Sequence, residues 1–434
     1  MLPIKRKFES VLWRLKQAAF GGYQRALKLF VETLTERYWL LDYLPTFSKH
    51  KEGVLLIRLD LIGDFVLWLD AALAYRQLYP NKRITLAVDS ACAELAKSLP
   101  HWDEVLGIDV QRLRKDFSYR LRVVIMLRRR NFAIAIQPTF SREFVGDLVL
   151  RSTCATERIG YVGDTNNIPD AKKTKTDFWY HKLIVNHSES QMELNTNAHF
   201  VRELGCIDFL SRVPVIANVA TLSAQHQISV PYIVIAPGAS WQPKMWPVRH
   251  FAELIRQLNS QFSIHFVLCG GKGDYAVCTE LEQDVSLNNL TNLAGRTSLL
   301  DLVNVIQAAA LVVSNDSSPI HIAAATATPA VCILGGGHFG RFLPYRPEQG
   351  PHTGVPTALW ASMECFGCRW RCTKAPEVGT TVPCISRVAV DEVLQSCLTH
   401  LNVSAQAASA SRCNNTNLIS DPVVRSLPRA RSSK

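Results

Sequence analysis

The 434-residue sequence contains no uninterrupted apolar run of about 20 residues, so it offers no segment that predicts a membrane-spanning helix. Near the N-terminus, no long apolar stretch precedes a small-residue cleavage site, so we expect no secretory signal. Twelve cysteines in a chain of this length do not resemble a disulfide framework. No internal repeat is present. We therefore expect a cytoplasmic protein with reduced cysteines.

The composition is that of a globular protein, with 47% hydrophobic and 20% charged residues. The length exceeds that of a typical single domain and predicts two domains. The formal net charge of +11 indicates an anionic partner, which could be nucleic acid, a phosphorylated substrate or an acidic membrane face. The alternative is a basic protein with no such partner.

The two ends of the chain differ from its middle. In residues 1–50, basic residues alternate with apolar and aromatic ones at roughly helical spacing. Such a segment is typical of an amphipathic helix on an anionic membrane, or of a helix packed on the main body. Residues 404–434 are rich in Ser, Ala, Asn and Arg and predict a disordered tail.

Between these ends, short apolar runs alternate with helical patterns, and the alternation begins twice. This predicts an α/β protein with two facing Rossmann-like, doubly wound parallel-sheet domains and a cleft between them. The predicted domains are 51–215 and 216–403, with a linker near 212–230. The expected strands are 54–59, 83–88, 132–136, 232–236, 264–269, 311–313 and 330–334. The expected helices are 65–78, 90–98, 247–260, 299–310 and 319–326.

The first candidate motif is Gly63-Asp64, at the first strand-to-helix turn. Glycine permits a tight turn and the close approach of another molecule. Asp64 stands at the start of the following helix, where it could be a general base or simply an N-cap. A helix N-terminus lowers the basicity of a carboxylate, so a base there needs compensation from burial.

The second motif is the loop from Ala236 to Pro247, in which Gly238, Ser240 and Lys244 follow a strand. Small residues leave backbone N–H groups available to an anion, and Lys244 adds a mobile positive charge. The alternative is an ordinary strand–loop–helix connection with an exposed lysine.

The third motif, from Ser314 to Ala325, is the most specific: it follows a strand and opens a helix. Ser318 is the expected N-cap and Pro319 the expected first helical residue. Free N–H groups and the positive end of the helix dipole favour a phosphate, with Ser317 and Ser318 beside it. Asp316 could accept hydrogen bonds from sugar hydroxyls. His321, one turn further, is by itself more typical of a packed histidine.

Two glycine-rich segments complete the set. In Gly270-Gly271-Lys272-Gly273-Asp274, the carboxylate of Asp274 could accept hydrogen bonds from ribose hydroxyls. Gly335-Gly336-Gly337-His338-Phe339-Gly340 formally matches a dinucleotide fingerprint, but no helical pattern follows it. We therefore expect no nicotinamide site.

In this order and at these distances, the motifs resemble glycosyltransferase family 9, the ADP-heptose:lipopolysaccharide heptosyltransferases, over about residues 53–400. The resemblance implies a GT-B fold whose C-terminal domain binds an ADP-sugar, and transfer with inversion but without a catalytic metal or cofactor. The chain contains no Asp-x-Asp triplet, which agrees with that expectation.

The resemblance also implies roles for single residues. Asp64 would be the general base on the acceptor hydroxyl. Lys244 and the helix start at Ser317-Ser318 would hold the diphosphate. Asp316 would contact the donor sugar, and Asp274 the ribose. Gly63, Gly238, Ser240 and His321 belong to the same substrate-binding motifs.

The sequence departs from the family pattern in three places. Asp-Ser-Ser replaces the usual Asp-Thr-Gly before the helix, the N-terminal prefix is long, and a cysteine cluster is added. The cluster has the spacing C-x2-C-x3-C-x11-C and could hold structural zinc or iron, the alternative being free thiols. Its members are Cys365, Cys368, Cys372 and Cys384.

The acceptor is less defined than the donor. A basic stretch could face an anionic saccharide, a lipid-linked acceptor or the inner face of the cytoplasmic membrane, or it could be a solvated surface. We expect no nucleic-acid partner. The alternative functions are heptosyl transfer to a protein hydroxyl and nucleotide-sugar binding without catalysis. The stretch comprises Arg112, Arg114, Lys115, Arg120, Arg122, Arg128, Arg129 and Arg130.

Overall fold

The computed structural model describes residues 51–186, 192–217, 228, 231–350, 354–374 and 380–402. The predictions for the extension 1–50 and the tail 404–434 lie outside these residues. The chain divides into two compact units. Among the described residues, the first unit runs to Pro214 and also includes Pro347–Gly350. The second contains Val215–Arg346 and the residues that follow Gly350.

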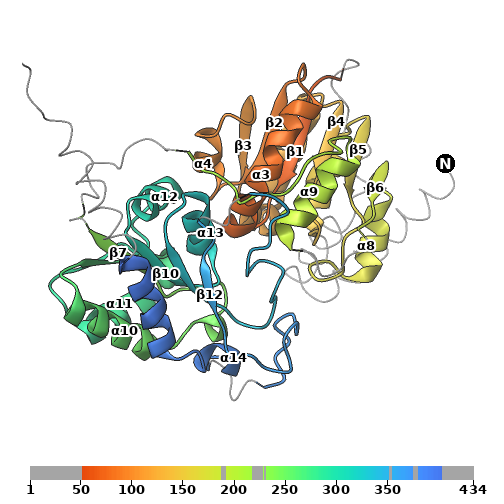
Figure 1. Cartoon of the computed structure of the whole chain (residues 1–434). Helices are drawn as coiled ribbons and strands as arrows, with labels where there is room; N and C mark the ends of the chain where they lie inside the picture. The colour runs from red at the N-terminus through yellow and green to blue at the C-terminus, as the bar shows by residue number, and fades with distance from the viewer. Residues whose placement is uncertain are drawn as a thin grey trace, which may run out of the picture. The chain divides into compact units, whose positions relative to one another are not determined.

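The first unit is built on a six-stranded sheet in the order β3-β2-β1-β4-β5-β6, with every pair parallel (Figure 1). Helices cover both faces of this sheet, so side chains that point to either face are buried. The first strands, β1 and β2, are therefore continuous apolar runs in the sequence. The strands are β1 (Val54–Arg58), β2 (Ile84–Asp89), β3 (Glu104–Ile108), β4 (Ile134–Gln137), β5 (Glu157–Tyr161) and β6 (Lys182–Ile184).

Helices cover this sheet in two groups: α3 packs against α9, whereas α6 packs against α5 and α7. Local capping fixes some of their starts, since Asp109 accepts a hydrogen bond from the Arg112 N–H and Asp116 accepts one from the Tyr119 N–H. The helices are α3 (Ile62–Leu78), α4 (Ala93–Lys97), α5 (Val110–Lys115), α6 (Phe117–Arg129), α7 (Phe144–Ser152), α8 (Asp170–Asp177) and α9 (Glu193–Glu203).

The second unit repeats the topology with the strand order β12-β11-β10-β7-β8-β9, again parallel throughout. Its strands are β7 (Tyr232–Ala236), β8 (His265–Leu268), β9 (Leu290–Asn292), β10 (Leu311–Asn315), β11 (Ala330–Ile333) and β12 (Thr357–Leu359). Its helices are η3 (Gln242–Lys244), α10 (Val248–Gln261), η4 (Lys272–Asp274), α11 (Tyr275–Val285), α12 (Leu299–Gln307), α13 (Ser318–Ala325) and α14 (Pro383–Ser386).

The predicted fold class, two doubly wound parallel α/β domains, is confirmed. In each sheet the first strand lies in the middle, and the chain builds outward first on one side and then on the other. The reversal falls between β1 and β4 in the first unit, and between β7 and β10 in the second. Ligands of such sheets bind at this switch point, outside the carboxyl ends of the strands.

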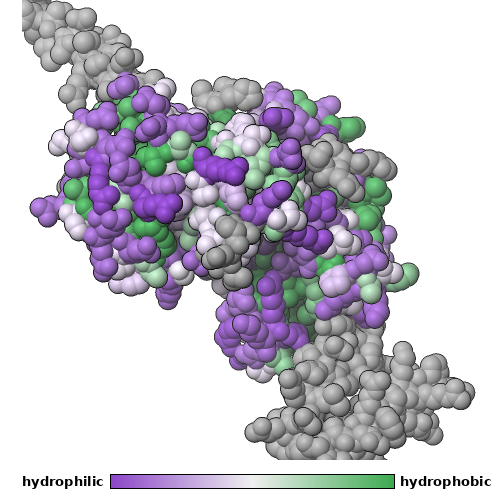
Figure 2. Space-filling model, turned by 90° about the horizontal axis from the view of Figure 1, so that it is seen from below, coloured by the Kyte–Doolittle hydropathy of each residue, from purple (hydrophilic) through white to green (hydrophobic). Residues whose placement is uncertain are grey.

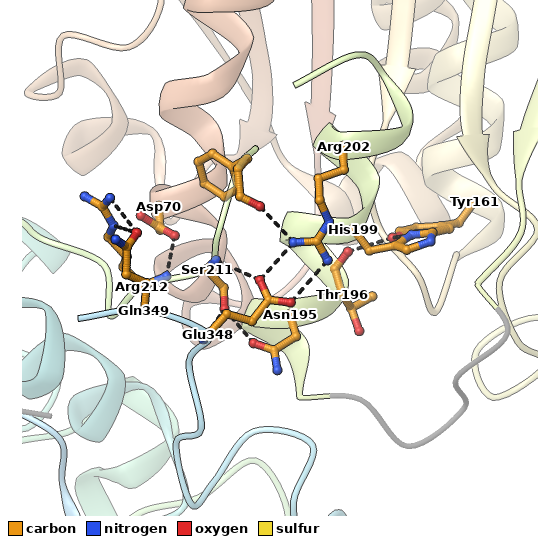
Figure 3. Close-up of polar contacts among 11 residues, drawn as sticks. Asp70, Tyr161, Asn195, Thr196, His199, Arg202, Ser211, Arg212, Glu348 and Gln349 are labelled. Atoms are coloured by element: carbon orange, nitrogen blue, oxygen red, sulfur yellow. Dashed lines mark hydrogen bonds and ion pairs between the residues drawn. The ribbon is translucent and has the colours of Figure 1, made fainter. Parts of the chain in front are cut away.

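The segment Pro347–Gly350 rejoins the first unit through polar contacts (Figure 3). Glu348 accepts two hydrogen bonds from the guanidinium of Arg202 at the end of α9, at 2.8 and 3.2 Å. The Ser211 N–H also donates to Glu348 at 3.0 Å, and the Glu348 N–H donates back to the Ser211 hydroxyl at 2.9 Å. Arg212 donates to the side chain of Gln349. This return segment is therefore anchored by ionic and neutral hydrogen bonds together.

No helix within the described residues is long and apolar enough to cross a membrane. The face of the molecule seen in Figure 2 is mostly hydrophilic, and its hydrophobic residues are scattered in small patches.

Candidate functional site

Asp64 lies in the first turn of α3, directly beyond the carboxyl end of β1. The helix begins at Ile62, three residues earlier than predicted, so the interpretation of Asp64 as an N-cap is wrong: the cap position is Leu61, which makes no side-chain bond. Gly63 lies within the same first turn. A half-buried carboxylate in this position is stabilised by the positive end of the helix dipole.

The sequence reasoning missed a buried charge cluster beneath this turn. Arg58, the last residue of β1, is fully buried, and its guanidinium donates to the backbone oxygen of Asp64 at 3.0 Å. It also pairs with Asp60 at 3.0 Å and lies 3.7 Å from Glu193 of α9. Arg58 thereby fixes the backbone that carries Asp64. A charged residue inside an otherwise apolar strand was the signal that could have identified it.

Asp60 is the second acidic group at this strand end, and its side chain is 16% exposed. Burial raises its pKa to about 6, although Arg58 opposes the shift; the negative charges of Glu193 and Glu143 add to it. Thr139, just after β4, lies 3.5 Å from one carboxylate oxygen of Asp60. The other oxygen is buried and has no hydrogen-bond partner among the residues that the structure describes. Asp60 thus lies at the switch point of the first sheet, between β1 and β4.

In the second unit, the loop after β7 is held by a residue that the sequence analysis did not single out. Asn315, buried at the end of β10, donates to the carbonyl of Pro237 at 2.6 Å and accepts from the Trp246 N–H at 2.9 Å. One side chain therefore fixes both ends of the predicted anion loop. Within that loop Ser240 is exposed, and Lys244 ends the short helix η3.

Asp274 packs directly against this loop. A Cβ atom at Gly238 or Gly270 would come closer than 3.0 Å to the Asp274 side chain, so a larger residue at either position would displace Asp274 from its present place. Asp274 also accepts a hydrogen bond from the Gly271 N–H at 2.8 Å. Burial raises its pKa, and the Gly271 N–H opposes the shift. The structure therefore brings the loop of Gly238 and the segment Gly270–Asp274 together at the ends of the adjacent strands β7 and β8.

The helix α13 starts beyond the carboxyl end of β10, one residue earlier than predicted. Its N-cap is Ser317, whose side chain makes no capping bond to the helix, and Ser318 is the first helical residue, so the predicted N-cap at Ser318 is wrong. Ser317 instead lies 3.1 Å from the buried hydroxyl of Ser314. Asp316 is half-buried between strand and helix. At the start of this eight-residue helix Pro319 has no N–H group, and the Ile320 N–H donates to the Ser317 carbonyl at 3.1 Å, so the N–H groups of Ser317 and Ser318 are the candidate anion donors at the switch point between β7 and β10.

His321 is buried and bonded to the Tyr345 hydroxyl at 2.7 Å, with the two rings stacked. Burial lowers its pKa to about 4, with Asp316 opposing the shift and Lys244 adding to it. His321 is therefore a neutral, packed histidine that lies within electrostatic range of the predicted site.

Lys244 is directed onto an aromatic ring. Its ammonium lies 4.5 Å from the centroid of the Trp370 ring. Trp370 comes from the segment between Cys368 and Cys372, so the cysteine cluster lies next to the predicted phosphate-binding lysine.

The four predicted metal ligands line one pocket, although they come from two segments of the chain. The Cys384 sulfur accepts from the Gly336 N–H at 3.4 Å. Burial raises the Cys384 pKa, and the three neighbouring thiols add to the rise. Thiolates are common ligands of zinc and iron, so the four cysteines have the right donor atoms for either metal. Among the residues that the structure describes, however, no three His, Cys, Asp or Glu side chains lie close enough together to hold a metal ion.

Three of the eight residues of the basic stretch form ion pairs within the first unit. Arg112 bonds to Asp116, Arg114 to Glu143 and Arg130 to Glu104. A shallow pocket on α6 is lined by Arg122, Ile125, Met126, Arg129 and Arg130.

Comparison with known proteins agrees with these motifs. The family model described as glycosyltransferase family 9 (heptosyltransferase) matches residues 127–358. Lipopolysaccharide heptosyltransferase 2 of Salmonella typhimurium is 24% identical over 307 residues, covering 65% of this chain and 82% of that protein. Lipopolysaccharide heptosyltransferase 2 of Escherichia coli is 37% identical over 109 residues, covering 24% of this chain and 31% of that protein.

Solved structures show the same fold at lower identity. E. coli ADP-heptose lps heptosyltransferase II superimposes with a TM-score of 0.61 at 20% identity, covering 81% of this chain and 99% of that one. E. coli heptosyltransferase WaaC with ADP gives a TM-score of 0.57 at 17% identity, covering 80% of this chain and 99% of that one.

Proposed function

This chain belongs to glycosyltransferase family 9, the heptosyltransferase family, and from that membership we propose that it transfers a heptosyl group from ADP-heptose to a saccharide hydroxyl of the lipopolysaccharide core. The observation that carries the proposal is the switch point of the second unit. A lysine, a helix N-terminus and two carboxylates gather there at the ends of β7, β8 and β10.

This arrangement suits a nucleoside diphosphate donor. The N–H groups that open α13 and the ammonium of Lys244 would stabilise the negative charge that grows on the departing diphosphate. Asp274 would accept from the ribose hydroxyls, and Asp316 from the sugar. Because these groups are held in place before the reaction, they could replace a metal ion on the leaving group. We accordingly propose a metal-independent transfer.

Asp64 is the proposed base on the acceptor hydroxyl, with attack on the face opposite the leaving group and therefore inversion. The dipole of α3 makes Asp64 a weak base. A weak base suffices when the anomeric carbon is already cationic, because the attacking hydroxyl becomes strongly acidic as its bond forms. Arg58 would keep the Asp64 backbone in place during this step.

The test is ADP release from ADP-heptose in the presence of a core saccharide acceptor, followed by mass analysis of the acceptor. Asp64→Asn should reduce turnover on the order of 10²-fold or more while ADP binding survives. Lys244→Met should weaken ADP binding itself. Asp70→Asn is the matched control, because Asp70 lies on the same helix and binds the Arg212 N–H. Unimpaired turnover in Asp64→Asn would reject the base assignment.

Two other outcomes identify the alternative functions. A heptose-sized mass increase on a co-expressed protein, with no transfer to core saccharides, would make a protein hydroxyl the acceptor. ADP-heptose binding without turnover on any acceptor would make the chain a binding protein. A lipid-linked acceptor would place the reaction at the inner face of the cytoplasmic membrane, where the pocket on α6 offers arginines to anionic headgroups.

For the cysteine cluster we propose that a structural zinc or iron ion, when bound, draws together Cys365, Cys368, Cys372 and Cys384, which line one pocket but lie too far apart for coordination as they stand. The Gly336 N–H would stabilise the thiolate of Cys384. Metal analysis of the purified protein should find about one ion per chain, and Cys384→Ser should lose it. Cys206→Ser, a change outside the cluster, should retain it.

A further inference from the structure

The glycine run Gly335–Gly337, which the sequence analysis set aside, has a definite place in the fold. It follows β11, and no helix comes directly after it. A Cβ atom at Gly335 or Gly337 would come closer than 3.0 Å to the indole of Trp370. At Gly336 it would meet the ring of Phe366 in the same way. The run therefore forms a flat surface on which two aromatic rings of the cysteine segment rest.

The backbone of that segment is bonded to the same glycines. The Gly367 N–H donates to the Gly336 carbonyl at 2.8 Å, and the Arg369 N–H donates to the Gly337 carbonyl at 2.8 Å. Arg369 and Trp370 both adopt left-handed backbone angles, with φ of 53° and 62°. Such angles cost free energy in residues with side chains and persist where the surroundings determine them. Trp370 is thus held in one orientation.

That orientation presents the face of Trp370 to Lys244, at 4.5 Å from ammonium to ring centroid. Trp241 and His338 contact the same ring edge-on, at centroid distances of 6.2 and 6.3 Å. Among the described residues, Lys244 forms no ion pair within 4.0 Å. The indole is therefore the group that restrains its long, flexible stem.

We infer that Trp370 is a positioning residue for the donor phosphates: its indole face holds the ammonium of Lys244 where a diphosphate can bind it. The inference rests on the proposed function. An aromatic face attracts a cation without neutralising it. A carboxylate in the same place would compete with the phosphates for the lysine. The cysteine segment, an addition to the family pattern, would thereby set the affinity of the neighbouring nucleotide site.

A double-mutant cycle on ADP affinity, measured by calorimetry, tests this role. Trp370→Leu should weaken ADP binding about tenfold, the equivalent of one well-placed cation–π contact, and Trp370→Phe should weaken it less. In a Lys244→Met background, Trp370→Leu should cause no further loss. Losses that multiply would mean that Trp370 only shapes the fold, and would overturn the inference. Trp360→Leu, another tryptophan of the second unit, is the control and should leave affinity unchanged.

A second measurement separates this inference from the proposed function. Lysines are reductively ¹³C-methylated, and the Lys244 signal is assigned by its absence in Lys244→Arg. In the native protein this signal should be shifted upfield by the ring current of Trp370. The shift should persist in Trp360→Leu, decrease in Trp370→Phe and disappear in Trp370→Leu. A native protein with this shift but no ADP binding would contradict the proposed donor, whereas ADP binding without the shift would overturn the role of Trp370.

Discussion

Replacing Asp60 by asparagine should stabilise the first unit above pH 7. The carboxylate is nearly buried, and burial raises its pKa from 3.8 to about 6 despite the adjacent Arg58. The folded protein therefore binds this proton more tightly than the unfolded chain does. The stability that the protonated group contributes is complete below pH 4 and is lost as the pH rises through 6. Asparagine keeps the shape of the protonated acid at every pH.

The magnitude follows from the size of the shift. Raising a pKa from 3.8 to about 6 corresponds to roughly 3 kcal/mol at most, at about 1.36 kcal/mol for each pH unit. Because the side chain is 16% exposed, solvent reduces that value, and we expect a gain of about 1–3 kcal/mol at pH 7.5. Near pH 4 the variant and the native protein should be almost equally stable. Arg58 keeps Glu193 as its remaining acidic neighbour in the variant.

The assay is urea unfolding between pH 4 and 8, with the first unit followed by hydrogen exchange in peptides of β1 and α3. Asp70→Asn is the control: burial also raises the Asp70 pKa to about 6, so this variant should change stability in the same pH window without touching Arg58. A loss of several kcal/mol in Asp60→Asn at pH 7.5 would refute the reasoning. It would show that the attraction between Arg58 and the Asp60 carboxylate is larger than the free-energy cost of burying that charge.

Three further predictions, two of them on variants, test other parts of the structure. Gly337→Ala should destabilise the second unit by about 1–3 kcal/mol in thermal unfolding, because the added Cβ collides with Trp370. Glu348→Gln should cost about 1–2 kcal/mol in urea unfolding, because it breaks the charged hydrogen bonds from Arg202. His321 should show no titration between pH 5 and 8 in NMR spectra, because burial lowers its pKa to about 4. A His321 midpoint near 6.5 would contradict the packing described for it.

The first two changes have matched controls. Gly273→Ala adds a Cβ with no heavy atom within 4 Å and should leave the unfolding temperature nearly unchanged. Asp284→Asn breaks the exposed pair with Arg256 and should cost less than Glu348→Gln. If Gly337→Ala were no more destabilising than Gly273→Ala, the close packing on Trp370 would not contribute to stability. If Glu348→Gln were no more destabilising than Asp284→Asn, the same would hold for the bonds of the return segment Pro347–Gly350.

The fold was predictable because its signals are local. Strands covered by helices on both faces appear as continuous apolar runs, and turn residues separate them from helices of distinct period. The order of these elements then predicts a doubly wound parallel sheet. Helix ends were less predictable: α3 and α13 begin before Asp64 and Ser318, because backbone bonds can extend a helix past a residue that resembles a cap.

By itself, the sequence determined the two α/β units, the family and the positions of Asp64, Lys244 and Asp316 beyond strand ends, because these depend on local pattern and motif order. Only the tertiary structure decided which side chains surround them. The cluster around Arg58 and the contact of Lys244 with Trp370 join segments far apart in the chain. Such partners follow from packing and burial in three dimensions, and no periodicity in the sequence encodes them.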